Sequence, residues 1–239
     1  MSAGEPMTVT FDLFSALIDS RTGAGAVFDR LSATYGWSVN GKTVYDAWDV
    51  QNKRAQRLCA TWQPYRALAG QALAEAYAAL HIEGDVAADL AQVLDSIPAW
   101  PLWPDVSEGL PTLGERYRLG LLSNVDDELF ARTQAAAYIQ PDLAMTSERL
   151  GAYKPSPAIY ERAQEALGPI VHIPTSARDV RGALEAGLPV VRLRRPGHEL
   201  DPDGPRPTLE ASHLGELAAL VPRAARRCAL DGSGREDAP

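Results

Sequence analysis

The chain begins with a short apolar segment that ends in a carboxylate. Val9, Thr10 and Phe11 are β-branched or aromatic, which predicts a buried strand starting near Thr8, and Asp12 follows at once. A charge at the end of a buried strand is costly unless it is solvated, paired or used. In parallel α/β sheets these strand ends open onto the ligand crevice. Taken alone, Asp12 is therefore either a nucleophile at that crevice or an acid that caps the next loop.

After the first strand the apolar positions follow a helical period. Residues 25–99 are rich in alanine and contain no convincing strand, and the clearest helices are expected over 67–80 and 86–97. The segment 100–104 contains two prolines, which stop a helical pattern and stiffen the chain. We interpret residues 20–104 as an all-helical insert that returns to the first unit through this segment.

Beyond residue 104 the pattern alternates between strands and helices. The expected strands are 118–124, 142–145, 170–173 and 189–193, and the expected helices are 106–116, 127–137, 158–167, 177–186 and 209–221. Such alternation is typical of right-handed βαβ units and a parallel sheet. The predicted fold is therefore α/β, with a Rossmann-like parallel sheet core formed by residues 1–19 and 105–222. The inserted all-helical cap is 20–104, and 223–239 is expected to be a flexible tail.

Composition narrows the classes of partner. A formal net charge of −8 argues against a nucleic-acid or anionic-membrane surface, and no apolar stretch is long enough to span a bilayer. The two cysteines, Cys59 and Cys228, have no metal-binding spacing, and the first strand leaves no room for a signal peptide. We therefore expect a reduced, cytoplasmic protein with a small-molecule partner. The oligomeric state is left open, with a homodimer among the options.

Polar residues follow the ends of successive expected strands. They are Asp12, then Ser123 and Asn124, then Lys154, then Thr175, Ser176 and Asp179. In a doubly wound sheet these ends converge on one crevice, so we expect the clusters to lie together. Each also has an ordinary alternative. Ser123 and Asn124 could cap a helix, Lys154 could be a surface residue, and Asp179 could complement a helix dipole.

The ordered set of motifs resembles the haloacid dehalogenase superfamily of hydrolases, and the resemblance runs over essentially the whole chain. Asp12 matches the nucleophile of motif one, and Ser123 matches the Ser/Thr of motif two. Lys154, followed by proline, matches the lysine of motif three, and 175–187 with Asp179 matches motif four. The insert stands where the family has its helical cap. The resemblance implies a covalent ester on Asp12 that water cleaves, with Lys154 lowering the pKa of the nucleophile.

The phosphatase branch of this family carries a second aspartate two residues after the nucleophile, which serves as general acid and base. Here the segment Phe14-Ser15-Ala16 replaces it and the Gly-Thr that follows it. The first acid of the phosphatase motif four is replaced by Thr175. Asp12 and Asp179 alone make a thin site for Mg²⁺, which requires several oxygen ligands in octahedral geometry. A magnesium-dependent phosphatase is therefore disfavoured, and no cofactor is expected.

The 2-haloacid dehalogenase branch is more similar. It resembles this chain in having an aromatic residue at the position of Phe14 and a tyrosine at that of Tyr160. The resemblance implies that Asp12 attacks the substrate Cα, halide leaves, and the ester is hydrolysed without a metal. The substrate-positioning residues implied are Phe14, Ser123, Asn124 and Tyr160, and Asp179 with Thr175 or Ser176 would orient the water of the second step.

The substrate pocket departs from that branch. Asp49 stands where the branch has a cap arginine that binds carboxylate and halide, and Ser176 replaces an asparagine of motif four. Lys53 or Arg54 could substitute, although a lysine does not reproduce the bidentate fork of arginine. Asp49 could instead favour a cationic or polyhydroxylated substrate, or be a surface residue of a helix. We expect Asp49 to lie at the pocket and leave the substrate open.

Two other functions stay open. One is a magnesium-dependent phosphatase or phosphonatase-like hydrolase that binds the metal through Asp12 and Asp179. The other is a non-catalytic relative that binds a small ligand or a protein, against which the intact Asp12–Lys154 pair argues, because an idle buried ion pair gives no clear gain in stability. The four histidines form no spaced pair, and His172, on an expected core strand, is interpreted as a packed residue.

Overall fold

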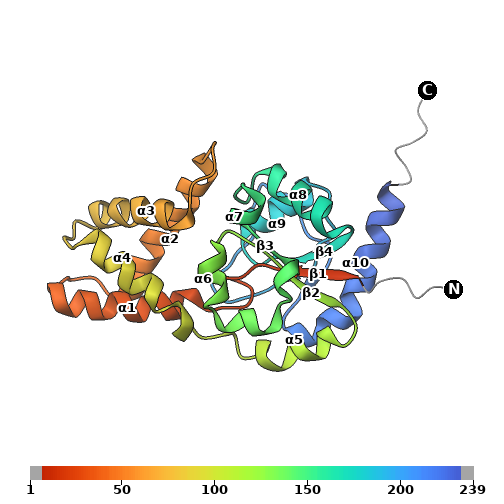
Figure 1. Ribbon diagram of the computed structural model, residues 1–239, viewed down its shortest axis with the longest axis horizontal. Helices are drawn as coiled ribbons and strands as arrows, with labels where there is room; N and C mark the ends of the chain where they lie inside the picture. The colour runs from red at the N-terminus through yellow and green to blue at the C-terminus, as the bar shows by residue number, and fades with distance from the viewer. Residues whose placement is uncertain (1–6, 233–239) are drawn as a thin grey trace.

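A four-stranded parallel sheet lies at the centre of the core (Figure 1). The computed structural model describes residues 7–232. The sheet order is β3-β2-β1-β4, with bounds β1 Thr8–Phe11, β2 Arg118–Ser123, β3 Ala144–Thr146 and β4 Ile170–Ile173. Phe11, at the end of β1, is in register with Leu121 and Ile173 on the neighbouring strands. The segments that follow β1, β2 and β4 therefore leave the sheet at the same edge, and the predicted α/β parallel sheet is confirmed.

Helices cover both faces of the sheet. They are α5 Val106–Gly114, α6 Asp127–Ala131, α7 Ser147–Leu150, α8 Pro157–Leu167, α9 Ala177–Glu185 and α10 Leu217–Gly232. On one face Leu110 of α5 and Leu217 of α10 join the cluster that contains Val9 and Phe11. On the other face α8 and α9 form a separate cluster with side chains of β2 and β4. All four residues of β1 are consequently buried, which explains its continuous apolar pattern.

Four further helices form a separate layer beside the core (Figure 1). They are α1 Ser20–Tyr35, α2 Gly41–Leu58, α3 Tyr65–Leu80 and α4 Val86–Asp95. The chain enters and leaves this layer through two adjacent segments, because Ile18 forms an antiparallel bridge with Leu102 and the amide of Asp19 donates to the carbonyl of Pro101 at 2.9 Å. The helices therefore form one insert, joined to the core by a paired two-segment connection that we call the hinge, residues 17–19 and 101–103.

The C-terminal third differs from expectation. The helix expected over 209–221 is wrong at its start: Glu210–Ala211 is strand β6, which pairs with β5 Arg192–Leu193, and α10 begins only at Leu217. Leu, Glu and Ala favour helix by themselves, and pairing with a neighbouring strand overrides that preference. The flexible tail is also wrong for 223–232, because α10 continues to Gly232 and Ala224 is buried. Residues 233–239 lie outside the described part of the chain.

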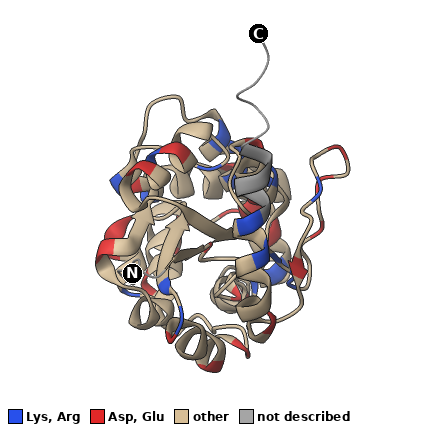
Figure 2. Cartoon of the chain, turned by 90° about the vertical axis from the view of Figure 1, so that its right-hand side faces the viewer, with Lys and Arg blue, Asp and Glu red and all other residues tan. Residues whose placement is uncertain are grey.

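Smaller differences concern two connections. The helix expected over 127–137 is split into α6 and a 3₁₀ segment, Gln134–Tyr138, and the strand expected over 142–145 begins at Ala144 after a 3₁₀ turn. Figure 2 shows acidic and basic residues interspersed on the helices and loops around the sheet. Within residues 7–232 no helix is both long and apolar enough to cross a bilayer.

The packing of α1 against α2 depends on a glycine. A Cβ at Gly41 would lie 2.0 Å from the carbonyl oxygen of Gly25 and 2.4 Å from the backbone nitrogen of Asp29. We therefore expect Gly41→Ala to lower the free energy of unfolding by at least about 1–3 kcal/mol, the usual cost of overpacking. Thermal unfolding followed by circular dichroism measures this.

The matched control is Gly70→Ala in the interior of α3. Its nearest neighbour would be the flexible end of Leu90, at 3.4 Å. Alanine is the better helix former, so this variant should be unchanged or slightly more stable. Equal stability of the two variants would show that the approach of α1 to α2 is not tight.

Candidate active site

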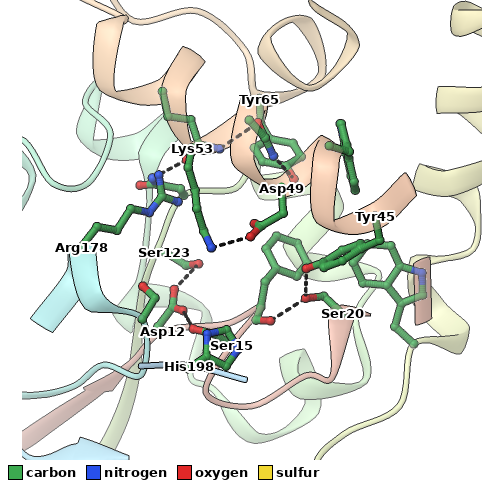
Figure 3. Close-up of a pocket in the computed structure, with 17 residues that line it drawn as sticks. Asp12, Ser15, Ser20, Tyr45, Asp49, Lys53, Tyr65, Ser123, Arg178 and His198 are labelled. Atoms are coloured by element: carbon green, nitrogen blue, oxygen red, sulfur yellow. Dashed lines mark hydrogen bonds and ion pairs between the residues drawn. The ribbon is translucent and has the colours of Figure 1, made fainter. Parts of the chain in front are cut away.

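Asp12 lies at the carboxyl end of β1, at the floor of a cavity, and is 8% exposed. Its Oδ1 accepts hydrogen bonds from Lys154 Nζ at 2.8 Å and from Ser123 Oγ at 3.1 Å. Its Oδ2 accepts one from Ser15 Oγ at 2.5 Å (Figure 3). Oδ1 is therefore held by a cation and a hydroxyl, whereas Oδ2 has a single hydroxyl partner among the described residues. Oδ2 is the oxygen better placed to act as a nucleophile.

Lys154 connects two carboxylates behind the cavity. It is 2% exposed, and besides Asp12 its Nζ donates to Asp179 Oδ2 at 2.6 Å and to the carbonyl of Leu122 at 2.8 Å. The three donors of the ammonium are thus all used. Asn124 fixes the backbone of the lysine, accepting from its N–H at 2.7 Å and donating to its carbonyl at 3.0 Å. Asn124 therefore positions Lys154, in addition to lining the cavity.

Asp179, in the first turn of α9, is 1% exposed and fully engaged. Besides Lys154 it accepts from the hydroxyl of Tyr160 at 2.9 Å and contacts His172 Nε2 at 3.2 Å through both oxygens. The other ring nitrogen of His172 lies 3.0 Å from the hydroxyl of Thr10. His172 is packed, as its strand position predicts, but it is also a partner of Asp179, which the sequence interpretation missed.

Two residues expected to contact substrate are turned away from the cavity. Tyr160 is fully buried, and its hydroxyl binds Asp179. Thr175 is also fully buried and donates to the carbonyl of Leu193 at 2.7 Å. Neither side chain lines the cavity, and each hydroxyl has a hydrogen-bond partner in the core. Ser176, by contrast, lines the cavity.

The charges in the network set the ionisation of both carboxylates. Burial by itself would raise the pKa of Asp12, but the ammonium of Lys154 outweighs it and holds that pKa below its usual value. Burial would also raise the pKa of Asp179, but Lys154 and His172 outweigh it and together hold that pKa well below the usual range for an aspartate. Both carboxylates are therefore ionised at neutral pH, so Asp12 is an available nucleophile and Asp179 is a weak base.

The cavity above Asp12 is small, with a volume of about 70 Å³. Pockets for drug-sized ligands are about 300–1,000 Å³. Its upper wall comes from the helical insert and is rich in aromatic side chains: Tyr45, Trp48, Tyr65 and Trp100. Phe14, from the loop after β1, packs against Tyr65 and Trp100 with ring centroids 6.2 and 5.7 Å apart. The core and the insert thus together line a small space suited to a substrate of few atoms.

Asp49 lines the cavity as expected, but it is paired. Its Oδ2 accepts from Lys53 Nζ at 2.5 Å, one turn further along α2, and both side chains are about one-third exposed, at 31% and 33%. Lys53 also lines the cavity, whereas Arg54 is exposed and outside it. The acid is therefore balanced by its own neighbour, which removes the argument for a cationic substrate.

Several residues at the cavity were missed from the sequence. Ser15 follows the nucleophile in the same loop and Arg178 immediately precedes Asp179, so motif position was an available signal for both. Gln56 has no motif position that would have marked it. Its side-chain oxygen accepts a hydrogen bond from Asn124 Nδ2 at 2.9 Å across the interface between the insert and the core. His198 lines the cavity from the loop after β5, and burial followed by Lys53 lowers its pKa. Nothing local in the sequence identifies these last two.

The donor set does not suit a hard divalent cation. The two carboxylates that would bind Mg²⁺, Asp12 and Asp179, are bridged by the ammonium of Lys154. Among residues 7–232 no group of three or more His, Cys, Asp or Glu side chains is arranged to hold a metal. Mg²⁺ requires near-octahedral oxygen ligands, so these residues do not fit it.

Comparisons with known proteins identify the fold. No protein-family model matches the chain. The (S)-2-haloacid dehalogenase 4A of Burkholderia cepacia is 29% identical over 126 residues, which are 50% of this chain and 54% of that protein. The aligned region thus spans about half the length of this curated relative.

Solved structures match over nearly the whole chain. The L-2-haloacid dehalogenase of Xanthobacter autotrophicus has a TM-score of 0.77 at 19% identity, covering 91% of this chain and 99% of its own. YfnB of Bacillus subtilis, bound to magnesium, has a TM-score of 0.73 at 14% identity, covering 91% and 99%. The chain therefore has the haloacid dehalogenase fold, so the resemblance predicted from its motifs is confirmed at the level of the fold.

The buried carboxylates predict a pH dependence of stability. Because the pKa values of Asp12 and Asp179 are lowered in the folded protein, each stabilises the fold above the unfolded value of about 3.9, and this contribution is lost as the pH falls below it. The free energy of unfolding should therefore fall steeply below about pH 4 and change little through these groups between pH 5 and 7. Urea unfolding at each pH measures it.

Asp12→Asn should make the acid limb of this profile shallower, because one of the two linked carboxylates is gone. Asp142→Asn, at an exposed position, is the control and should keep the wild-type slope. An unchanged slope in Asp12→Asn would mean that the ion pair with Lys154 does not hold in solution.

Proposed function

We propose that this protein is a hydrolase that releases halide from a small 2-haloacid through a covalent ester on Asp12, without a metal. The observation that carries the proposal is an ionised carboxylate at a small cavity, with one oxygen held by Lys154 and Ser123. Support also comes from the Xanthobacter autotrophicus structure with chloropropionic acid covalently bound, which has a TM-score of 0.76 at 18% identity and covers 91% of this chain and 98% of its own.

The first step is a displacement at carbon. Asp12 Oδ2 attacks the substrate Cα, the C–O bond forms, and the carbon–halogen bond breaks with its electron pair leaving on the halide. The halide is a stable anion and needs no proton. Phe14, which stands where phosphatases carry their proton-transferring aspartate, is therefore no obstacle to this step.

The second step hydrolyses the ester. Water attacks Asp12 Cγ, the bond from Cγ to the substrate oxygen breaks, and a 2-hydroxyacid leaves while the carboxylate is restored. Negative charge develops on Oδ1, where Lys154 Nζ and Ser123 Oγ already lie within hydrogen-bond distance. These two donors form the oxyanion site of this step.

The attacking water must also lose a proton. Asp179, the residue expected to orient it, already accepts from Lys154, Tyr160 and His172 and does not line the cavity. His198 does line it, and its ring lies beside Asp12 and Ser15 in Figure 3. Because its pKa is lowered, the imidazole is neutral at pH 7 and can accept the proton from the water and then give it to the departing substrate oxygen, which leaves as the hydroxyl of the 2-hydroxyacid. We assign that role to His198.

The decisive experiment follows halide from 2-chloropropionate and phosphate from a panel of phosphomonoesters, each with Mg²⁺ or with EDTA. We expect halide release that EDTA does not change, and Asp12→Asn should lower it by at least about 10³-fold, as for other covalent nucleophiles. Asp142→Asn serves as the control with the same chemical change. Phosphate release that requires Mg²⁺ would establish the phosphatase alternative, and silence in every arm would favour a non-catalytic, ligand-binding role.

The assignment of His198 is tested separately by rapid-quench kinetics. His198→Gln should release about one halide per site at the wild-type rate and then slow, because the ester accumulates; the steady-state rate should fall about 10²–10⁴-fold, the usual contribution of a general base. His213→Gln, at an exposed histidine, should match the wild type. A steady-state rate unchanged by His198→Gln returns the role to Asp179.

The cytoplasmic location and the homodimer stay predictions.

A further inference from the structure

We propose that Arg178 binds the carboxylate of the substrate, in the role that the aligned cap position, Asp49, does not fill. This rests on the proposed function in so far as the substrate is taken to be a 2-haloacid. Arg178 stands in the first turn of α9, directly before Asp179, and it lines the cavity. Figure 3 shows its side chain extending from α9 toward the helical insert, alongside Lys53.

The guanidinium of Arg178 has an unsatisfied donor. Its Nη1 is buried and has no hydrogen-bond partner among the described residues. A buried donor of a charged group that is left unpaired is destabilising, because it has lost its water and gained no partner. Arg195, a buried arginine elsewhere in the core, is by contrast paired with Asp105 at 2.8 Å and with the carbonyl of Ala16 at 2.9 Å. Among the residues that line the cavity, Arg178 is the one with a buried side-chain atom that has no partner in the described part of the chain.

The charges around the cavity point to the same residue. Lys154 is shared by Asp12 and Asp179, and Lys53 is neutralised by Asp49. Within residues 7–232, Arg178 has no carboxylate partner and so supplies the positive charge that remains available at the cavity. An anionic ligand would complete the pairing, and a cationic one would be repelled.

The chemistry of the side chain indicates which anion. A guanidinium presents two parallel N–H donors that match the two oxygens of a carboxylate, which a lysine cannot do. The cavity volume of about 70 Å³ admits an acid of few carbon atoms. Because Arg178 and Asp12 line the same cavity, a 2-substituted acid held by Arg178 can present its Cα to Asp12 Oδ2. The inferred ligand class is therefore a short 2-substituted monocarboxylic acid.

The test uses binding of a compound that does not react. L-lactate, the type of product expected, is titrated into the wild type and the variants by calorimetry, with neutral lactamide as the uncharged comparison. Arg178→Gln should raise the Kd of lactate about 10- to 100-fold, the loss of a charge-assisted hydrogen bond, and leave that of lactamide nearly unchanged. Arg178→Lys should recover part of the affinity.

Arg181→Gln is the matched control. It removes the same charge from the same helix, but the Arg181 side chain is partly exposed, paired with Glu185 and Asp201, and outside the cavity. Its lactate affinity should equal that of the wild type. The thermal midpoint of Arg178→Gln verifies that this variant is folded.

The outcomes separate this inference from the proposed function. Wild-type lactate affinity in Arg178→Gln, or no lactate binding by the wild-type protein, overturns the inference, and loss of binding only in Lys53→Gln moves the carboxylate site to Lys53. Lactate binding that depends on Arg178 in a protein that releases no halide keeps the inference and overturns the reaction. Halide release that depends on Asp12 but not on Arg178 keeps the proposed reaction and overturns the inference.

Discussion

The ammonium of Lys154 between the carboxylates of Asp12 and Asp179 is the interaction on which the rest of this structure depends. All three groups are nearly excluded from solvent. Removing one partner of such a network typically costs about 3–5 kcal/mol, whereas an apolar replacement of the whole would often be neutral. The presence of such a network is therefore weak evidence that it stabilises the fold and better evidence that its charges have a functional role. Here it keeps Asp12 ionised and places a cation where negative charge would develop.

The core and the helical insert contribute different properties to the cavity. The core supplies the ionised groups, whose positions are set by strands in fixed register and by hydrogen bonds such as those between Asn124 and the backbone of Lys154. The insert supplies aromatic walls and the Asp49–Lys53 pair. The hydrogen bond from Asn124 to Gln56 joins the two layers. Because the insert is attached through the paired hinge segments, opening the cavity would break contacts of this interface and leave the charge network intact.

The errors of the sequence interpretation have a common cause. Residues 209–211 form a strand because β5 offers them a partner, which outweighs a local preference for helix. Tyr160 matches a motif position, yet its hydroxyl lies behind Asp179 and outside the cavity. His172 has the strand position of a packed residue, and its contact with Asp179 arises from the turn between β4 and α9. In each case the outcome is decided either by a partner elsewhere in the chain or by the direction in which a side chain points. Neither can be read from the local sequence.

The sequence by itself determined the class of fold, the helical nature of the insert and the positions of Asp12, Ser123, Lys154 and Asp179 at strand ends. It could do so because hydrophobic periodicity and short motifs are local, and parallel strands place their ends at one edge. Only the tertiary structure decided which polar groups face the cavity and which already have hydrogen-bond or ion-pair partners in the core. Arg178 is the sharpest case. Its neighbour in sequence is fully paired, whereas its own Nη1 is unpaired, and that difference exists only in three dimensions.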